Sequence, residues 1–466
     1  MTFLFEKKHF SSFRIIIFGF MLVIFAGALL LTLPASAFAQ GSSLSAFSPY
    51  TFYGLGDFSV QGPAFLRSMG GIGVAYANGR RMNYLNPASY SAVNPRSVLF
   101  NVGGEMYNIY AKTADSKTSY NTFNVRDVSM QIPLAKRLGF GFSMTPLSDV
   151  GYRVKMTEMD PFMLANVGNI VYDYEGEGNT TQFKFGLGWS PFKRFSFGAD
   201  VIYYHGVITR NFNTIISPMI EEKPQRSMLG TQRETYSQAG VTLGIQYDFI
   251  LNDNRSFTFG ATFRPRVNLR PETTRTIVAK DVFIDTVDYK ISRSDYYLPS
   301  TFTAGLYYQT RKVGMGLDYT FEKWKGINQS DLIDGIRYRN NNFIKVGMQF
   351  TPNAQDVRRY FNRCTYRVGF RYNSYYMNIN DHNIDDKAIT LGFGFPIRQG
   401  LSCINVGFDF GQRGMTASGI YTVPPSEPGG LTSQRAYQMV RERYFRVSVE
   451  LTLFGEDYWF LKQKYQ

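Results

Sequence analysis

The chain has 466 residues, a formal net charge of +14 and a mean hydropathy of −0.20. Its basic residues are spread along the sequence without a recognition helix or motif, so we expect no nucleic-acid partner. The expected counterpart of the positive charge is the anionic outer membrane, with its lipid and lipopolysaccharide. Aromatic residues make up 16% of the chain, with 41 Phe and 32 Tyr, and such rings are typical of the lipid-facing side of membrane barrels.

Residues 1–39 are predicted to be a signal peptide. Basic residues precede an apolar run at 15–33, and Ala37 and Ala39 favour cleavage before Gln40. The run is long enough to span a bilayer, so a membrane anchor is the alternative. The small residues after the run and the absence of a later apolar run favour a cleaved signal and export to the outer membrane of a Gram-negative cell.

Residues 40–96 are too rich in glycine and proline for regular strands. Among their motifs are Met69-Gly70-Gly71-Ile72-Gly73-Val74-Ala75 and Asn86-Pro87-Ala88. Glycine and proline at this density favour compact, folded-back turns. We therefore expect a separate N-terminal segment here, before the first strand.

Residues 97–454 are predicted to form an all-β domain of fourteen strands. In the clearest one, Phe445–Leu453, every odd position is apolar and every even position is polar, which puts the two sets on opposite faces. Repeated around a closed sheet, this pattern indicates a 14-stranded antiparallel transmembrane β-barrel. The strands are expected near 97–110, 122–133, 138–150, 179–190, 194–209, 233–248, 255–268, 298–309, 311–324, 340–351, 364–377, 387–397, 401–413 and 440–454.

Short and long connections alternate between these strands. Short turns and long polar loops are the rule for the periplasmic and outer ends of such barrels. The link 352–363 is longer than the other periplasmic turns. With an even strand number both barrel ends lie in the periplasm, so 455–466 is expected to be a short periplasmic tail. A lumen of this width can hold about fifty residues, and we expect 40–96 to plug it as a hatch.

At this point the chain resembles the FadL-like family of outer-membrane proteins, the transporters of long-chain fatty acids and hydrocarbons. The resemblance rests on the strand number, the N-terminal segment and the two motifs quoted above. Ser48-Pro49-Tyr50, Tyr53-Gly54-Leu55-Gly56-Asp57 and the tail Tyr458-Trp459-Phe460 are similar to a Bacteroidota branch of that family. Some members of this branch resemble accessory subunits of type IX secretion or of outer-membrane protein assembly, so the family implies the fold and leaves the task open.

The resemblance also implies candidate site residues. In the transporters the asparagine of the second motif belongs to the hatch and helps to control ligand movement, and their third strand is distorted to open a lateral path. The corresponding positions here are Gly70, Gly71, Gly73, Asn86, Pro87 and Ala88 for hatch and gating, and Gly139, Gly141 and Pro146 for a lateral gap. Proline cannot donate to the strand ladder. The alternative is that Pro146 only marks the end of its strand.

Basic side chains are expected in the lumen. Strand phase places seven of them on inward faces: Lys184, Arg264, Arg266, Lys345, Arg367, Arg371 and Arg446. They would bind an anionic headgroup, or they would pair with inward carboxylates such as Asp318, Glu322, Asp409 and Glu450 and so neutralise charge inside the wall.

Catalytic chemistry is not expected. His205 and His382 lie far apart, and no nucleophile motif accompanies either of them. The loop 381–386 begins like a calcium loop, but Asp386 stands where glycine is required and Gly392 stands where the final glutamate is required. We therefore predict no enzyme, no cofactor and no metal site.

Two functions fit these predictions. The first is a hatch-gated diffusion channel for small hydrophobic or amphipathic molecules. The second is a non-transporting barrel subunit of an outer-membrane protein assembly or type IX secretion complex. A continuous apolar pocket that reaches a gap in the wall would favour the channel. A sealed lumen would favour the subunit, as would a broad exposed apolar surface on the extracellular loops or near 352–363.

Overall fold

The computed structural model describes residues 47–52, 54–94, 97–217, 227–279, 287–291, 296–327, 336–397, 402–423 and 433–454. All of them belong to one compact unit, Ser45–Gln466. The predicted signal peptide and the predicted tail at 455–466 lie outside the described residues. No helix among the described residues is long and apolar enough to cross a membrane.

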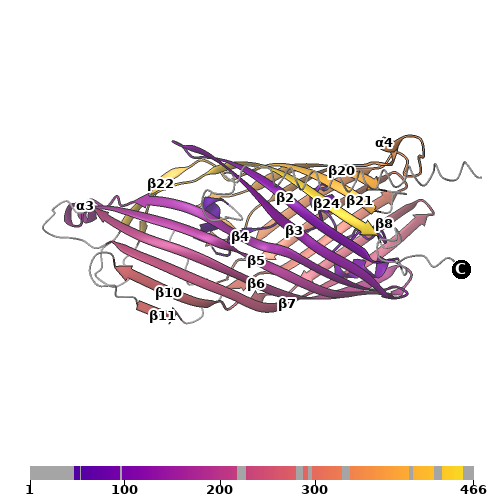
Figure 1. Cartoon of the computed structure of the whole chain (residues 1–466), viewed down its shortest axis with the longest axis horizontal. Coiled ribbons are helices and arrows are strands. Elements are labelled where there is room, and N and C mark those ends of the chain that lie inside the picture. The colour runs from indigo at the N-terminus through magenta and orange to yellow at the C-terminus, as the bar shows by residue number, and fades with distance from the viewer. Residues whose placement is uncertain are drawn as a thin grey trace, which may run out of the picture. The chain divides into compact units, whose positions relative to one another are not determined.

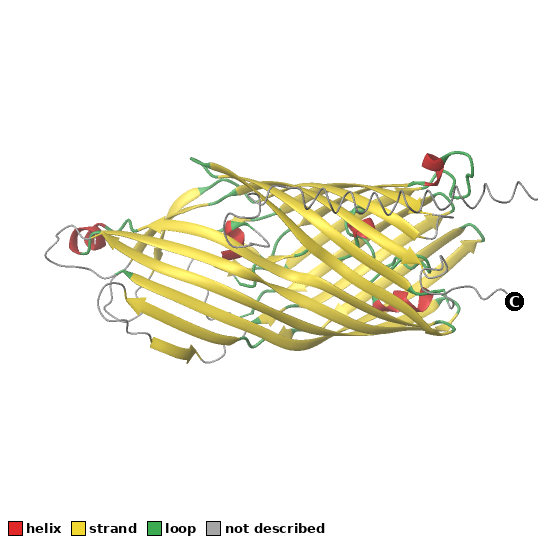
Figure 2. Cartoon of the chain, in the orientation of Figure 1, coloured by secondary structure: helices red, strands yellow, loops and turns green. Residues whose placement is uncertain are grey.

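The main sheet closes into an antiparallel barrel (Figures 1 and 2). It has 17 strands, of which β1, β10 and β11 lie outside the wall, so fourteen make the barrel, and β2 pairs with β24 to close it. The predicted 14-stranded barrel is therefore confirmed. The wall strands are β2 (Leu99–Lys112), β3 (Lys117–Ala135), β4 (Leu138–Thr157), β5 (Asn169–Phe192), β6 (Phe195–Ser217), β7 (Met228–Asn252), β8 (Arg255–Arg264), β13 (Ser300–Thr310), β14 (Val313–Lys323), β16 (Asn341–Phe350), β17 (Thr365–Asn373), β20 (Asp386–Ile397), β21 (Ser402–Arg413) and β24 (Arg441–Phe454).

The two faces of each strand meet different surroundings. In β24 the side chain of Val449 is 49% exposed on the outer face, whereas Ser448 and Glu450 are buried. The same alternation holds in β5, where Leu187 and Trp189 are exposed and the glycine between them is buried. Apolar side chains therefore face lipid, and polar or small ones face inward, as a period of two requires.

The strands next to the long connections extend further than predicted. The stretches 151–178 and 210–232 were expected as loops, but β4 runs to Thr157, β5 begins at Asn169, and β6 and β7 continue the same hairpins. The helix α3 (Pro161–Asn166), capped by Asp160, lies between β4 and β5. In the extension of β4 the buried side is apolar, with Tyr152, whereas the exposed side carries Arg153 and Lys155, so the outward apolar signal that lipid imposes is missing there.

Short elements complete the same end of the barrel. The other two predicted loops, 269–297 and 414–439, also contain strands. The elements are β9 (Val267–Asn268), β10 (Glu272–Ala279), β11 (Val287–Ile291), β12 (Tyr297–Leu298), β15 (Ile336–Tyr338), β18 (Met377–Ile379), β19 (His382–Asn383), β22 (Ser418–Val423) and β23 (Ser433–Gln438). At the opposite end the connections are short turns, apart from the link with α4 (Tyr360–Arg363) (Figure 1).

The N-terminal segment 47–94 has little regular structure. It contains η2 (Pro49–Phe52), β1 (Asp57–Phe58), α2 (Ala64–Arg67) and η3 (Pro87–Ala92). It packs against inward glycines of the wall. A Cβ atom on Gly347 or Gly369 would collide with the backbone of Met69 or Gly70, and one on Gly198 would collide with Pro87. Glycine at these wall positions is what allows the two backbones to approach so closely.

Candidate functional site

The wall has an interrupted ladder between its second and third strands. β3 and β4 pair from Ala135–Leu138 only as far as Val128–Met144. Beyond that point β3 continues to Lys117 beside β2, and β4 continues to Thr157 beside β5. The two strands diverge toward the end of the barrel that carries α3, with a turn of the indigo N-terminal segment visible between them (Figure 1).

A β-bulge lies in each strand where the pairing stops. Arg126 is the extra residue in β3, since Gly103 faces Asp127 and Gly104 faces Val125. Leu147 is the extra residue in β4, where the register shifts between Pro146 and Ser148. A bulge bends its strand and increases the local twist. Two bulges at the same level therefore explain why the strands separate there.

The N-terminal segment occupies the edge that β3 leaves free on β4. β1 pairs antiparallel with β4, with Asp57 opposite Asp149 and Phe58 opposite Ser148. The amide of Ser59 donates to the carbonyl of Leu147 at 2.9 Å. The side chain of Gln61 donates to the carbonyl of Pro146 at 2.9 Å. The segment thus replaces β3 as the hydrogen-bonding neighbour of β4.

A charged cluster spans the same opening. The guanidinium of Arg126 on β3 donates to the Ser59 hydroxyl at 3.1 Å. It also lies 3.8 Å from Glu105 on β2 and 3.9 Å from Asp149 on β4. Arg67 of the N-terminal segment forms a buried ion pair with the same Glu105. The cluster therefore ties the N-terminal segment to both sides of the opening.

Apolar side chains gather beside the opening. Leu147, Val150 and Tyr152 of β4 are buried in one cluster with Leu55 of the N-terminal segment. The cluster continues through β6 and β7 to β9, β12 and the residues next to them, with Ile202, Tyr204, Ile208, Tyr236, Val267, Leu269, Tyr296 and Leu298. Phe52 and Phe58 pack against it. An apolar part of the interior therefore lies next to the charged cluster at the interrupted ladder.

The glycine motif of the N-terminal segment contacts the wall through its backbone. Gly70 and Gly71 have φ values of 72° and 84°, which side chains rarely adopt. The amide of Gly70 donates to the Thr390 hydroxyl at 2.9 Å. The amides of Gly73 and Val74 both donate to the buried carboxylate of Asp318, at 2.6 and 3.0 Å.

Asn86 joins three parts of the structure and is fully buried. Its amide nitrogen donates to the carbonyls of Val74 at 2.8 Å and of Ile245 on β7 at 3.0 Å. Its side-chain oxygen accepts the amide of Ala88 at 3.0 Å and so caps η3, with Pro87 at the first helical position. This asparagine holds the second motif against both the glycine motif and the wall.

The three residues predicted for a lateral gap lie in two places. Gly139 and Gly141 are still paired with β3, and both face Tyr90 of η3. Pro146 lies beyond the last β3–β4 pair, beside the bulge at Leu147. Pro146 does not end its strand, because β4 runs eleven residues further to Thr157.

Three of the seven predicted lumen cations, Arg367, Arg371 and Arg446, are buried and partnered. Arg371 donates to Asp409 at 2.8 Å, and Arg446 lies 4.0 Å from Glu105. Arg367 donates to Asn405 at 3.0 Å. Of the others, Lys345 is buried in β16, while Lys184 and Arg264 are half-buried, with Arg264 donating to Thr301 at 2.8 Å. These contacts agree with ion pairing and hydrogen bonding inside the wall.

Arg266 was predicted on an inward face of the same strand as Arg264, and this is wrong. β8 ends at Arg264, and Arg266 is exposed with its guanidinium 3.6 Å from the Tyr297 ring centroid. Pro265 between them lacks the amide that a continuing ladder would need.

A second buried network at the N-terminal segment was not predicted. Arg413 of β21 is within 2.7 Å of Glu442 on β24 and within 2.6 Å of Asp57. Glu442 also accepts the Ser48 hydroxyl at 2.5 Å. The alternation along β21 and β24 predicts that the side chains of Arg413 and Glu442 point inward. The sequence does not show that they contact residues more than 350 positions away, Asp57 and Ser48.

The acidic loop at 381–386 is occupied by protein partners. Asp381 lies 3.3 Å from Arg337, Asp385 lies 3.0 Å from Arg339, and Asp386 accepts the hydroxyl of Tyr444 at 2.6 Å. Within the described part of the chain no group of His, Cys, Asp and Glu side chains is arranged to hold a metal ion.

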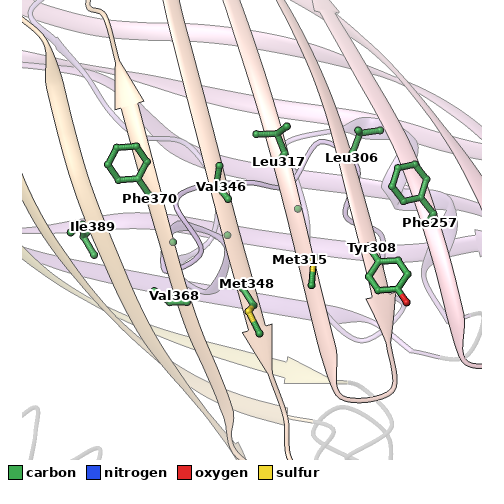
Figure 3. Close-up of a pocket in the computed structure, with 13 residues that line it drawn as sticks. Phe257, Leu306, Tyr308, Met315, Leu317, Val346, Met348, Val368, Phe370 and Ile389 are labelled. Carbon is green, nitrogen blue, oxygen red and sulfur yellow. The ribbon is translucent and has the colours of Figure 1, made fainter.

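A depression marks the outer face of the wall on the side of β13 to β20. Its volume is about 720 Å³, and its lining is almost entirely apolar. Figure 3 shows the lining side chains on neighbouring strands, among them Leu317 on β14, Val346 and Met348 on β16, and Val368 and Phe370 on β17. Outward phase puts this depression on the lipid side of the barrel.

The closed wall of fourteen strands and the N-terminal segment packed on its inward glycines give the fold of a FadL-type β-barrel. A FadL homologue of Pseudomonas aeruginosa has the same fold, with a TM-score of 0.59, 12% identity, and 85% of this chain and 99% of that chain covered. The toluene transporter TodX of P. putida has a TM-score of 0.54 at 15% identity, and the match covers 84% of this chain and 97% of that chain. The toluene transporter TbuX of Ralstonia pickettii has a TM-score of 0.51 at 13% identity, and the match covers 84% of this chain and 97% of that chain.

The particular family follows from the sequence. The BamG family model matches residues 21–422, which is most of the chain, and the chain belongs to the BamG family. No curated protein matches it.

Proposed function

We propose that this protein is a diffusion channel for small hydrophobic or amphipathic molecules, closed by residues 47–94 acting as a hatch. The observation that carries the proposal is the interrupted ladder between β3 and β4, whose free edge on β4 is held by the hatch instead of by the wall. The segment is held to the wall by hydrogen bonds and ion pairs, so it can leave the edge of β4 without unfolding the barrel. Its departure would join the interior to the membrane.

The substrate class follows from the surroundings of the opening. Beside the charged cluster at the opening lies a buried apolar cluster that includes Leu55, Leu147 and Val150. A hydrophobic molecule gains free energy by staying in an apolar phase, so a sideways exit into lipid suits it better than an aqueous pore. Two of the fold relatives are toluene transporters, and a third is a channel for monoaromatic hydrocarbons. Those names support the class without identifying the molecule.

A reversible cross-link tests the proposal. Phe58 and Ser148 face each other directly, and residues directly opposite in antiparallel strands have Cα atoms about 4.5–5.5 Å apart, within disulfide range. In a background where the two buried free thiols Cys364 and Cys403 are serine, Phe58→Cys with Ser148→Cys should stop uptake of radiolabelled toluene or fatty acid when oxidised. A reductant should restore uptake.

The matched control is a disulfide in the fixed wall. Lys387 and Gln412 face each other on β20 and β21, and cysteines there should leave uptake unchanged in both redox states. Pro146→Val, which gives β4 back an amide at the bulge, should lower uptake without lowering the amount of barrel in the membrane. Unchanged uptake after oxidation of the hatch disulfide would refute the channel proposal.

A second function, a non-transporting subunit of an outer-membrane protein assembly or secretion complex, is favoured by a separate observation. The hatch is held by buried ion pairs at two places, Arg67–Glu105 and Arg413–Glu442 with Asp57, which makes it hard to displace. Membership of the BamG family leaves this function open, as does the similarity of the 48–57 motifs to a Bacteroidota branch. Fixed partners after extraction in mild detergent, and loss of other barrels on depletion, would support it.

A further inference from the structure

The link between β16 and β17 is an ordered projection at the end of the barrel with short turns. Asp356 accepts the amides of Arg358 and Arg359 at 2.8 and 2.9 Å and the side-chain amide of Asn362 at 2.6 Å. The amide of Asn353 donates to the carbonyl of Asn362 at 2.8 Å and closes the loop. These contacts hold the pKa of Asp356 below its usual range, with the Asn362 hydrogen bond as the largest cause. The projection is therefore a built structure.

The projection carries three cations and no free anion. Arg358 and Arg359 are exposed, and Arg363 lies over the Tyr360 ring at 5.1 Å with its Nε buried and unpartnered. Its one carboxylate, Asp356, is already used three times within the loop. Among the described residues no carboxylate lies within ion-pair distance of these arginines. A positive group of this kind suits a phosphate.

The projection leans over the outer face of the wall. The hydroxyl of Tyr360 donates to the carbonyl of Pro396 on β20 at 3.2 Å. The hydroxyl of Tyr366, which stands on the outer face of β17, donates to the carbonyl of Phe361 at 3.1 Å. Phe361 is 70% exposed and Val357 is 94% exposed. α4 rises beyond the rim of the barrel in Figure 1.

An aromatic row joins the projection to the lipid-facing surface. Tyr366 packs edge-on against Phe393 at 6.0 Å, and Phe393 stacks with Phe395 at 6.4 Å. Aromatic rings gather at the level of the lipid headgroups in such barrels. The three arginines follow this row at the end of the barrel with short turns.

The outer depression begins directly above the projection. The two strands joined by the link, β16 and β17, line its middle with Val346, Met348, Val368 and Phe370 (Figure 3). Val368 is two residues from Tyr366, about 7 Å along the strand. The volume of about 720 Å³ is within the range of roughly 300–1,000 Å³ that ligand sites occupy. Cations at the rim and an apolar depression above them match a headgroup and its chains.

We propose that this outer face binds one anionic phospholipid of the periplasmic leaflet, with its phosphate on Arg358, Arg359 and Arg363 and an acyl chain in the depression.

Native mass spectrometry of the full barrel tests the site. With added dioleoylphosphatidylglycerol, the wild type should retain one lipid more tightly than it retains dioleoylphosphatidylcholine. The variant R358Q/R359Q/R363Q should lose about tenfold or more of this affinity, since each basic residue contributes to the attraction of an anionic headgroup. Val368→Trp, which fills the depression from the lipid side, should lower retention without changing any charge. Inorganic phosphate should not displace the lipid.

The control removes charge elsewhere at the same end. Lys193 and Arg194 are exposed in the short turn between β5 and β6, and K193Q/R194Q should retain the lipid as the wild type does. Equal loss in this control, or wild-type retention in the triple variant, would overturn the proposal. A photo-cross-linker at Phe361 should capture lipid in native membranes, and capture of a fixed protein there would assign the face to a protein partner instead.

Discussion

Replacing Asn86 by alanine should release the hatch while leaving the barrel folded. The side chain is fully buried and makes three hydrogen bonds: to Val74, to Ile245 and from Ala88. Loss of an N-cap costs about 1 kcal/mol, and each of the two lost amide hydrogen bonds costs about 1 kcal/mol. The closed state of the hatch should therefore lose about 3 kcal/mol of stability relative to the open state, which raises the population of the open state roughly a hundredfold.

Hydrogen exchange and conductance measure this directly. The amides of η3 should lose about hundredfold protection at constant pH, and single-channel conductance in planar bilayers should rise, while β24 stays protected. Asn86→Ser keeps a capping oxygen and should lie between the wild type and the alanine variant. If η3 stays protected in Asn86→Ala, the asparagine does not hold the hatch and the reasoning is wrong.

Three further predictions concern single residues. Val449→Arg should lower the free energy of unfolding from lipid vesicles by about 2–4 kcal/mol, with Val449→Leu as its control in urea titrations. Glu105→Gln should lower the free energy of unfolding by about 3–5 kcal/mol, because Arg67 and two other buried cations lose their carboxylate partner. Unchanged heat stability on gels would refute this. The pKa of Asp356 is lowered by folding, so its contribution to the order of the 352–363 link is present at neutral pH and is lost as the pH falls through the folded value. Exchange of the link amides, compared across pH and with Asp356→Asn, checks this.

The sequence determined the barrel and the phase of its strands. Lipid on one side and the interior on the other impose a period of two, and β24 shows it in full, with Val449 outside and Ser448 inside. The same signal fades where strands leave the membrane, which is why the upper parts of β4 to β7 were expected as loops. Glycine density in the N-terminal segment marked a chain without long strands.

The tertiary structure alone decided the site. The ladder between β3 and β4 stops because bulges at Arg126 and Leu147 turn both strands and β1 takes the free edge, and a strand edge carries no sequence code for its partner. The ion pair from Arg413 to Asp57 joins residues 356 positions apart. Pro146 could be singled out from the sequence because proline lacks an amide hydrogen. Gly139 and Gly141 could not be assigned, because the sequence does not distinguish a glycine that weakens strand pairing from one that makes room for Tyr90. Local pattern sets which way a side chain points, and only the closed fold sets what it meets.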